Sequence, residues 1–389
     1  MINEKKFFLI FTYLFWPFFY IRALINKQRN RDLRFLIIDT AKIGDMVCST
    51  PVFATIKKRY PNSFLAILTI SQVKGILENN PRIDKIILID SFQYQGIRGK
   101  LKLIKYLKKK NFLWSFRLNP MGWLDAISFW AGVPNRVTTT SKYASLSSKL
   151  MSIFANFKKE YRIHTLKSRH NLDLLKFIGI KNPKEKREVF LNQIVLEKAN
   201  QFLKNCNISE TDFLVGFSVT AGNKLKEWSL EKFAKVADRI INKYSAKVIF
   251  IGAPNDCQKV DQTINFMQNR SYNVCGKFNL SELPALMTKF KLFVSLDTGP
   301  LYIAQSLGVP IVDIVGPFEV YENLPKEAKA VIVKKNISCY PCSHVIPTAR
   351  YCKMGHLDCL NKVTIDDVFE AVKNVIEKYF LINQKIIRI

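Results

Sequence analysis

The stretch from residue 295 to residue 317 constrains the fold most, because it joins a strand end, a glycine turn, a helix and a second strand. The apolar run Leu292–Val294 predicts a buried strand, and Asp297–Pro300 ends it with turn and cap residues. Helical spacing follows over Leu301–Leu307, and Ile311–Val315 predicts the next strand. A strand, a helix and another strand in this order are typical of an α/β fold with a parallel sheet.

The turn in this stretch suits an anion. Free backbone N–H groups at the start of a helix favour negative charge, and Gly299 lets a phosphate approach closely. An ordinary strand–helix turn in which Asp297 acts as the cap would give the same local pattern. The stretch by itself therefore leaves both a phosphate site and a plain turn open.

The charge of the chain indicates an anionic partner. The 389 residues are enough for two α/β cores. They include 60 Lys and Arg against 31 Asp and Glu, a formal charge of +29, which favours an anionic surface or substrate. Since no nucleic-acid-binding motif accompanies the basic residues, we expect a membrane or a phosphorylated glycolipid rather than nucleic acid. A solvated basic surface accounts for part of the excess.

The cysteines fall into two sets. Four are scattered along the chain, which favours a reducing compartment over a secreted disulfide scaffold. The other four follow the spacing C-x2-C-x9-C-x6-C, with His344 and His356 nearby, and suit either a structural zinc ion or two local disulfides. Because the second pair is spaced more widely than in a zinc ribbon, we expect no bound metal. Zinc stays the less favoured alternative for Cys339, Cys342, Cys352 and Cys359.

Residues 7–21 are uncharged and mostly aromatic or aliphatic, with Pro17 among them. As a helix they would extend about 22 Å, short of the roughly 30 Å hydrocarbon core of a bilayer. No small-residue cleavage site follows, so a signal peptide fits poorly. A helix at the membrane surface fits better, because the basic segment Arg22–Arg34 would meet anionic headgroups. The alternative is a helix that packs on the protein itself.

Strands and helices alternate through the rest of the chain, which predicts parallel sheets covered by helices. In the first half we expect a loop over Ala41–Met46, and then a helix capped by Ser49 and Thr50. Loops and a helix are expected over Ala131–Tyr161, and the charged segment Lys181–Arg187 is the candidate linker. The helices expected in the second half cover residues 229–244, 280–290, 301–307 and 364–379.

Asp45 is the candidate general base. Lys42, Gly44 and Asp45 follow the predicted strand Phe35–Ile38, so the carboxylate would lie at the C-terminal edge of the sheet, where ligands bind in such folds. A carboxylate held there is able to take a proton from a sugar hydroxyl, and Lys42 is able to neutralise a phosphate. The competing interpretation is that Asp45 only caps a turn and that Lys42 is solvated.

The second half offers a candidate site for a diphosphate. Ser218, Thr220 and Lys226 follow the strand predicted at Phe213–Phe217, and hydroxyls with a Lys stabilise such a leaving group without a metal. Asp256 follows another strand and would bind a ribose hydroxyl or serve in a turn. The sequence has neither a P-loop nor a tight G-x-G-x-x-G motif, which argues against an ATPase or an orthodox dinucleotide site.

These segments together resemble glycosyltransferase family 9, the ADP-heptose:lipopolysaccharide heptosyltransferases. The family's I-G-D followed by T-P is similar to Ile43–Asp45 and Thr50–Pro51. Its K-x-W-P-like segment is similar to Lys226–Trp228, although a Ser follows instead of Pro. Its D-[TS]-G-x-x-H-x-A is similar to Asp297–Ala304, with a Tyr in place of His. The resemblance spans residues 34–372.

The resemblance implies a GT-B fold, two Rossmann-like doubly wound domains facing a cleft, here with an N-terminal apolar and basic helical extension. It implies inverting, metal-independent transfer of heptose or a related sugar from an ADP-sugar, with no cofactor and with Asp45 as the base. Tyr302 replaces the family His, so a neutral hydroxyl stands where a phosphate-side contact is expected. The implied donor-binding residues are Ser218, Thr220, Lys226, Asp256, Asp297, Thr298, Gly299 and Tyr302, and those on the acceptor or phosphate side are Lys42 and Gly44.

The resemblance also sets expectations for organisation and location. We expect a cytoplasmic monomer attached peripherally to the inner face of the cytoplasmic membrane. Its expected partners are a nucleotide sugar, a phosphorylated glycolipid acceptor of the lipopolysaccharide type and an anionic membrane surface. The alternative is a membrane-attached protein that keeps the GT-B shell and binds a nucleotide sugar but is catalytically impaired. The expected domains are a membrane-associating segment (1–33), an acceptor-side domain (34–185), a nucleotide-sugar domain (186–363) and a C-terminal helix (364–389).

Overall fold

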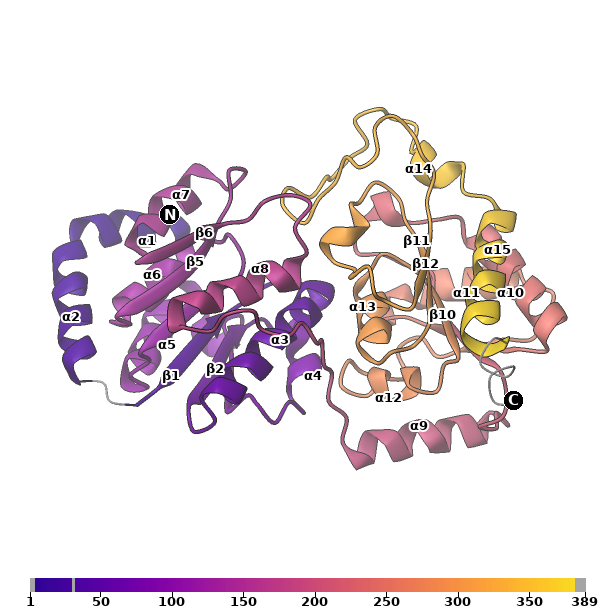
Figure 1. The fold of residues 1–389 in the computed structure, drawn as a ribbon, viewed down its shortest axis with the longest axis horizontal. Helices are drawn as coiled ribbons and strands as arrows, with labels where there is room; N and C mark the ends of the chain where they lie inside the picture. The colour runs from indigo at the N-terminus through magenta and orange to yellow at the C-terminus, as the bar shows by residue number, and fades with distance from the viewer. Residues whose placement is uncertain (1–3, 30–31, 382–389) are drawn as a thin grey trace. The chain divides into compact units, whose positions relative to one another are not determined.

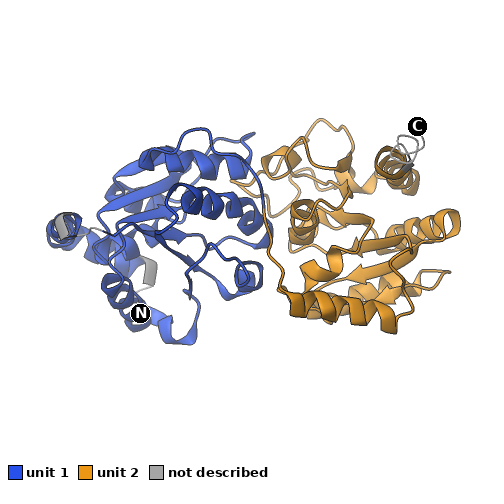
Figure 2. Cartoon of the chain, turned by 60° about the horizontal axis from the view of Figure 1, so that its bottom comes forward, with its two compact units in different colours: residues 1–187 blue, residues 188–389 orange. Residues whose placement is uncertain are grey.

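The structure is a computed structural model that describes residues 4–29 and 32–381. The chain divides into two compact units, residues 1–187 and 188–389 (Figure 2). Each unit contains one six-stranded sheet with helices on its faces (Figure 1), which confirms the predicted α/β class. The finer division at residues 33, 185 and 363 stays a prediction, and its last segment extends past the described residues.

The sheet of unit 1 has the strand order β3-β2-β1-β4-β5-β6, and all its described pairings are parallel. The strand order reverses between β1 and β4, and sheets of this kind bind ligands outside the carboxyl ends of the strands at such a point. The strands are β1 (Arg34–Ile38), β2 (Phe64–Thr69), β3 (Lys85–Leu88), β4 (Trp114–Arg117), β5 (Asn135–Thr140) and β6 (Phe157–Glu160).

The helices of unit 1 pack apolar faces onto this sheet. In the fifth helix, Leu103, Ile104 and Leu107 recur at helical spacing and are buried, whereas its Lys residues lie mostly on the outer side. The described helices are α1 (Glu4–Leu14), α2 (Trp16–Arg29), α3 (Ile43–Arg59), α4 (Lys74–Leu77), α5 (Gly96–Lys109), α6 (Trp123–Trp130), α7 (Leu146–Met151) and α8 (Lys167–Asp173).

The predicted start of α3 is wrong. The helix begins at Ile43 rather than after Thr50, and Pro51 lies inside it. Pro51 has no N–H to donate to the Val47 carbonyl one turn earlier, and the Thr50 hydroxyl donates to that carbonyl instead (2.8 Å). Because this contact replaces the missing one, the helix continues through the proline, and Asp45 lies in its first turn and not in a loop.

The segment Ala131–Tyr161 contains the predicted helix, α7, but also forms two strands, β5 and β6, where only loops are predicted. The β5 residues Thr138 and Thr139 are polar, yet both are fully buried. The Thr138 hydroxyl donates to Asp125, and the Thr139 hydroxyl lies 3.1 Å from a ring nitrogen of His170. Long-range contacts of this kind allow a polar strand to be buried, and no local pattern reveals them.

The N-terminal segment forms the pair α1 and α2, whose axes are bent by 76°. One side of the pair packs on unit 1, since Phe8 is fully buried and the Phe19 ring stacks on Trp130 with centroids 4.7 Å apart. No single described helix is long and apolar enough to cross a bilayer, although this bent pair passes the same criteria of length and composition. The exposed apolar side chains of the pair are Ile10, Tyr13, Leu14, Phe15, Trp16, Phe18, Tyr20, Ile21, Leu24 and Ile25.

The sheet of unit 2 has the strand order β12-β11-β10-β7-β8-β9, again with parallel pairings. Here the strand order reverses between β7 and β10. The two units therefore have the same arrangement of strands, although no internal repeat is evident in the sequence. The strands are β7 (Leu214–Ser218), β8 (Lys247–Ile251), β9 (Tyr272–Asn273), β10 (Leu292–Leu296), β11 (Ile311–Ile314) and β12 (Ala330–Val333).

Helices cover both faces of the second sheet, with α10, α11 and α15 on one side and α12 and α13 on the other (Figure 1). Ser229 and Thr364 cap α10 and α15, as predicted. The helix predicted over residues 280–290 is too long, because the Asn279 side chain holds a turn before α12 begins at Leu283, with Pro284 in its first turn. The described helices are α9 (Gln193–Asn205), α10 (Leu230–Tyr244), α11 (Cys257–Asn265), α12 (Leu283–Met287), α13 (Gly299–Ser306), α14 (Asp358–Asn361) and α15 (Ile365–Ile376).

Candidate active site

An ion pair lies where the strand order of unit 2 reverses. The loop after β7 carries Lys226, and the loop after the neighbouring strand β10 carries Asp297. Lys226 Nζ lies 2.6 Å from Asp297 Oδ2 and 3.1 Å from the Asp297 carbonyl oxygen. It also lies 4.0 Å from the centre of the Phe318 ring, a cation–π contact. Three segments that are distant in sequence thus hold one ammonium group at the carboxyl ends of the strands.

Two further groups contact or influence this pair. The Tyr302 hydroxyl, on a residue only 2% exposed, donates to Asp297 Oδ1. Asp313, on β11, is fully buried, and neither of its carboxyl oxygens has a hydrogen-bond partner among the described residues. Burial and the nearby Asp297 raise the pKa of Asp313 well above its usual range, although Lys226 opposes the shift. Burial therefore favours the neutral form of the Asp313 carboxyl group.

The start of α13 lies directly after this ion pair. Thr298 is the N-cap residue, but its side chain makes no capping hydrogen bond and donates instead to the Leu296 carbonyl at 3.3 Å. The first turn then contains Gly299 and Pro300, both half-buried. First-turn N–H groups without a side-chain cap are ready to bind an anion. The structure thus places Thr298 and Gly299 beside Lys226 and Asp297.

The other predicted donor residues lie in two places. Ser218 ends β7 and Thr220 follows it, so both are close in sequence to the Lys226 loop, and both are at least nine-tenths buried. Asp256 follows β8, and its Oδ2 accepts a hydrogen bond from the Ala253 N–H at 2.9 Å. That contact is the turn role that the sequence left open for Asp256.

In unit 1, Asp45 lies in the first turn of α3, and a carboxylate there interacts favourably with the helix dipole. Lys42 is the N-cap residue and is exposed, whereas Gly44 is buried. All three follow β1, on the side of the sheet where its strand order reverses. This placement agrees with the expectation that Asp45 lies at the carboxyl edge of the sheet.

A second carboxyl group, Asp39, organises the segment between β1 and α3. Its Oδ2 accepts from the Ser49 hydroxyl at 2.6 Å, and its Oδ1 accepts from the Ala41 N–H at 3.1 Å and from Asn119 Nδ2 at 3.4 Å. Burial raises the pKa of Asp39 to about 6, and nearby Asp45 contributes to the shift. The group thus changes charge near neutral pH, next to the candidate base.

Sequence reasoning missed several residues of both clusters. Asp39 directly follows an apolar strand, the same signal that singled out other residues, and Asp313 is the one charged residue within the apolar run Ile311–Val315. Sequence reasoning could therefore have found Asp39 and Asp313. Phe318 and Asn119 carry no comparable local signal, because they reach their clusters only through contacts between loops.

Comparison with known proteins identifies the family. Residues 101–350 match the family described as glycosyltransferase family 9 (heptosyltransferase). The chain is 25% identical over 290 residues to the lipopolysaccharide core heptosyltransferase OpsX of Haemophilus influenzae, covering 72% of this chain and 77% of that protein. The matched range contains Lys226, Asp297 and Asp313, whereas Asp39 and Asp45 precede it.

Solved structures show the same fold. A family 9 glycosyltransferase from Veillonella parvula superimposes with a TM-score of 0.76 at 22% identity, covering 90% of this chain and 99% of that one. The ADP-heptose lipopolysaccharide heptosyltransferase II of Escherichia coli gives a TM-score of 0.71 at 16% identity, covering 89% and 99%. The fold is thus GT-B, as predicted. The chain belongs to glycosyltransferase family 9, and it is a glycosyltransferase.

Proposed function

We propose that this protein transfers heptose, or a related sugar, from an ADP-sugar to a phosphorylated glycolipid of the lipopolysaccharide type. The observation that carries the proposal is the cluster of Lys226, Asp297 and the start of α13 where the strand order of unit 2 reverses. That cluster offers one cation and a helix start to a diphosphate. The names of the relatives favour heptose as the sugar and lipopolysaccharide as the acceptor.

In this proposal unit 2 binds the donor. The first-turn N–H groups of α13 hold the diphosphate, with Thr298 and Gly299 nearest to it, and Lys226 adds positive charge. The negative charge that develops on the leaving ADP is then stabilised by the N–H dipoles of α13 and by the Lys226 ammonium group, so no metal ion is needed at the breaking bond. Ser218 and Thr220 line the same strand end, and Asp256 lies at the end of the neighbouring strand, β8.

Unit 1 then supplies the base. Asp45 removes the proton from the acceptor hydroxyl as that oxygen attacks the anomeric carbon and the bond from this carbon to the ADP oxygen breaks. One displacement of this kind inverts the configuration. Asp39 and Ser49 hold the segment that precedes and supports Asp45, since the Ser49 hydroxyl lies 2.6 Å from Asp39 and 3.1 Å from the Asp45 carbonyl.

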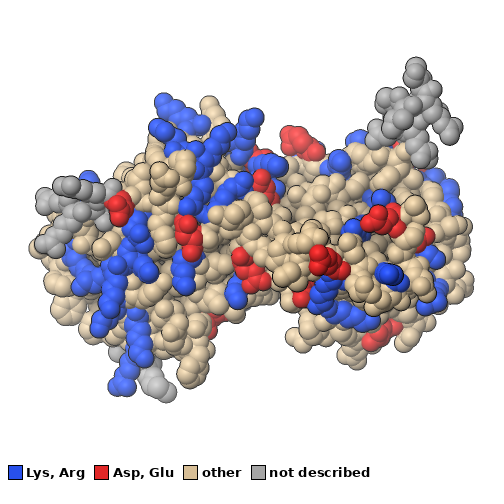
Figure 3. Space-filling model, turned by 90° about the horizontal axis from the view of Figure 1, so that it is seen from below, with Lys and Arg blue, Asp and Glu red and all other residues tan. Residues whose placement is uncertain are grey.

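The proposed location is the inner face of the cytoplasmic membrane, reached from the cytoplasm. The exposed apolar side of α1 and α2 supports it, because an apolar face beside basic residues suits a bilayer surface with anionic headgroups. Figure 3 shows many Lys and Arg side chains on the visible face of unit 1. A phosphorylated glycolipid in that surface would meet the same positive charge.

Two assays test the proposal. First, the melting temperature is measured with ADP, ADP-heptose, UDP-glucose and GDP-mannose, and ADP-heptose is expected to raise it most, because a ligand that binds the folded state stabilises it. Second, ADP release from ADP-heptose is followed with and without a heptose-deficient lipopolysaccharide. Release that depends on the acceptor supports the transfer. Binding of ADP-heptose without release would favour the catalytically impaired alternative, and no binding of any ADP compound would refute the proposal.

A further inference from the structure

A long irregular loop in unit 2 carries most of the second cysteine set. The 24 residues 334–357 connect β12 to α14 and contain no strand or helix. Loops this long without regular structure are uncommon in compact domains unless something holds them in place. The loop carries Cys339, Cys342 and Cys352, and Cys359 follows on α14.

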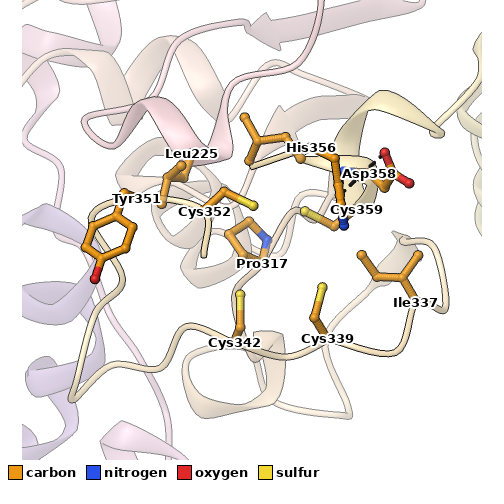
Figure 4. A pocket seen from close by; sticks show the side chains of 11 residues that line it. Leu225, Pro317, Ile337, Cys339, Cys342, Tyr351, Cys352, His356, Asp358 and Cys359 are labelled. Carbon is orange, nitrogen blue, oxygen red and sulfur yellow. Dashed lines mark hydrogen bonds and ion pairs between the residues drawn. The ribbon is translucent and has the colours of Figure 1, made fainter. Parts of the chain in front are cut away.

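The four thiols face one another across a small cavity. Figure 4 shows the sulfur atoms of all four directed into the same space. The cavity has a volume of about 10 Å³, and its lining also includes His356 and Asp358. All eight cysteines of the chain are free thiols, so the predicted alternative of two local disulfides is not formed. In the described residues no three of these ligand atoms all lie within 4.8 Å of one another, so a bound ion would draw them together.

Cys352 lies in a tight turn. The Gly355 N–H donates to the Cys352 carbonyl at 3.2 Å, and Gly355 has a φ of 76°, which lets the chain reverse direction there. The turn leads directly to α14, so Cys352 and Cys359 line the same cavity.

The four thiols differ in burial, although they line one space. Cys359 is buried, Cys339 and Cys352 are partly buried, and Cys342 is exposed. A divalent ion is able to occupy a space lined by four sulfur atoms, because it deprotonates a coordinating thiol.

We propose that these four cysteines bind one transition-metal ion in a tetrahedral tetrathiolate site. Four sulfur ligands select zinc or iron over magnesium or calcium, which prefer oxygen. The ion would have a structural role, since four protein ligands leave no open position for a substrate. The proposal reverses the expectation from cysteine spacing, which favoured no bound metal.

The site would also support the proposed donor-binding loops, a consequence that rests on the proposed function. The cavity is lined by Leu225 and Pro317, which directly precede Lys226 and Phe318. The loop is tied to both segments, since the Cys342 N–H donates to the Pro317 carbonyl at 3.1 Å and Asn223 Nδ2 donates to the Ala349 carbonyl at 3.0 Å. Metal binding would therefore hold in place the loop that packs against the segments carrying Lys226 and Phe318.

Gly316 shows how closely these segments approach. A Cβ atom at this position would lie 2.9 Å from Leu360 Cδ1 and 3.1 Å from the Leu225 carbonyl oxygen. Leu360 directly follows the fourth cysteine, so α14, the Leu225 segment and the end of β11 pack against one another with no room for a side chain. A change at the cysteines would thus be transmitted to the Lys226 loop through direct packing.

The test measures metal in the full-length protein, purified without a metal-affinity step from cells grown with both zinc and iron. Mass spectrometry of the elements should find about one zinc or one iron per chain, and the absorption bands of a ferric tetrathiolate identify iron. The variants Cys342→Ser and Cys352→Ser should each lose at least about nine-tenths of that metal. Cys206→Ser, which changes a thiol outside the cluster, is the matched control and should keep it.

A second measurement needs no variant. Alkylation with iodoacetamide should modify the four cysteines at least about tenfold faster after chelation than before it, with Cys206 unchanged. Protein that holds no zinc or iron and alkylates all four thiols at the rate of Cys206 would overturn the proposal, as would two disulfides. Because neither readout uses ADP, failure of the metal site and failure of the proposed transfer are distinguishable.

Discussion

The two units share one strand order but differ in the charged groups near the point where that order reverses. In unit 2 a Lys contacts the carboxylate directly, with 2.6 Å between Lys226 Nζ and Asp297 Oδ2. In unit 1, among the described residues, Asp39 accepts hydrogen bonds from neutral groups, and the buried Lys167, which donates to the Leu118 carbonyl at 2.9 Å, opposes the rise of the Asp39 pKa without cancelling it. Asp297 is thus held in an ion pair, whereas Asp39 titrates.

This difference matches the two halves of the proposed reaction. A diphosphate needs permanent positive charge and N–H groups, which Lys226 and the start of α13 supply. Proton transfer instead needs carboxyl groups whose pKa values lie near the working pH, and burial brings that of Asp39 to about 6. Variants at Asp45 and Asp39 should therefore change proton transfer and pH dependence, whereas variants at Lys226 should change donor binding.

The largest effect is expected for the candidate base. Asp45→Asn should lower turnover by about 10²–10⁴-fold, because the amide cannot take the acceptor proton. Donor binding should change little, since the proposed donor residues all belong to unit 2. Steady-state rates and an ADP-heptose melting shift measure the two effects. Glu78→Gln, at a weak surface ion pair of unit 1, serves as the control, and turnover near that of the control would exclude Asp45 as the base.

Removal of the Lys in unit 2 should affect both stability and binding. Lys226→Met leaves Asp297, whose side chain is 1% exposed, without its cation and should cost about 3–5 kcal/mol in the free energy of unfolding. The double variant Lys226→Met with Asp297→Asn removes the buried charge and should regain much of that stability. ADP affinity, measured by calorimetry, should stay at least about tenfold weaker in both variants. Wild-type affinity in the double variant would contradict a donor role for Lys226.

The pH dependence of unit 1 should follow Asp39. Its pKa is raised in the folded state to about 6 from an ordinary 3.8, so between these values the folded state holds the extra proton. The free energy of unfolding therefore falls as the pH rises from about 4 to 6, by about 3 kcal/mol at most from this group, and levels off above pH 7.

Asp39→Asn removes this titration. Urea unfolding at pH 5 and pH 8 should show that the variant gains stability relative to the wild type as the pH rises. Asp84→Asn, at a part-exposed ion pair with Lys57, is the matched comparison and should not produce a gain of that sign. Equal pH slopes for wild type and Asp39→Asn would show that Asp39 is ionised throughout this range.

The sequence predicted the elements whose residues carry their own signal. Apolar runs located β1, β7 and β10, and the capping hydroxyls of Ser229 and Thr364 located the starts of α10 and α15. It failed at β5 and at the start of α3, where long-range contacts bury polar residues and where the Thr50 hydroxyl compensates for Pro51. At β5 a long-range contact overrides the local propensity, and at α3 a local hydroxyl contact offsets the usual effect of a proline inside a helix.

The candidate site likewise divides into residues that the sequence predicted and contacts between them that it did not. Lys226 and Asp297 were each predicted to bind the donor, but their direct contact joins residues 71 positions apart and depends on the pairing of β7 with β10. Tyr302 illustrates the limit most clearly. The resemblance implies a hydroxyl on the phosphate side, which stays a prediction, and the structure adds that this hydroxyl donates to Asp297 from a nearly buried residue.

The smallest effect is expected at Tyr302, and it separates a positioning role from direct phosphate contact. Tyr302→Phe removes the hydroxyl from Asp297, which keeps Lys226 as a partner, so the loss of stability should be about 1–2 kcal/mol. If the hydroxyl only positions Asp297, ADP affinity should fall by less than about threefold, whereas a lost contact with a charged phosphate should lower it about tenfold or more. Calorimetric titration of the variant and of the wild type with ADP distinguishes the two roles. Tyr302→His sharpens the test. Burial opposes protonation of an imidazole at this position and the neighbouring Asp297 favours it, so a gain in ADP affinity below about pH 6, relative to the wild type, would indicate a phosphate close to residue 302.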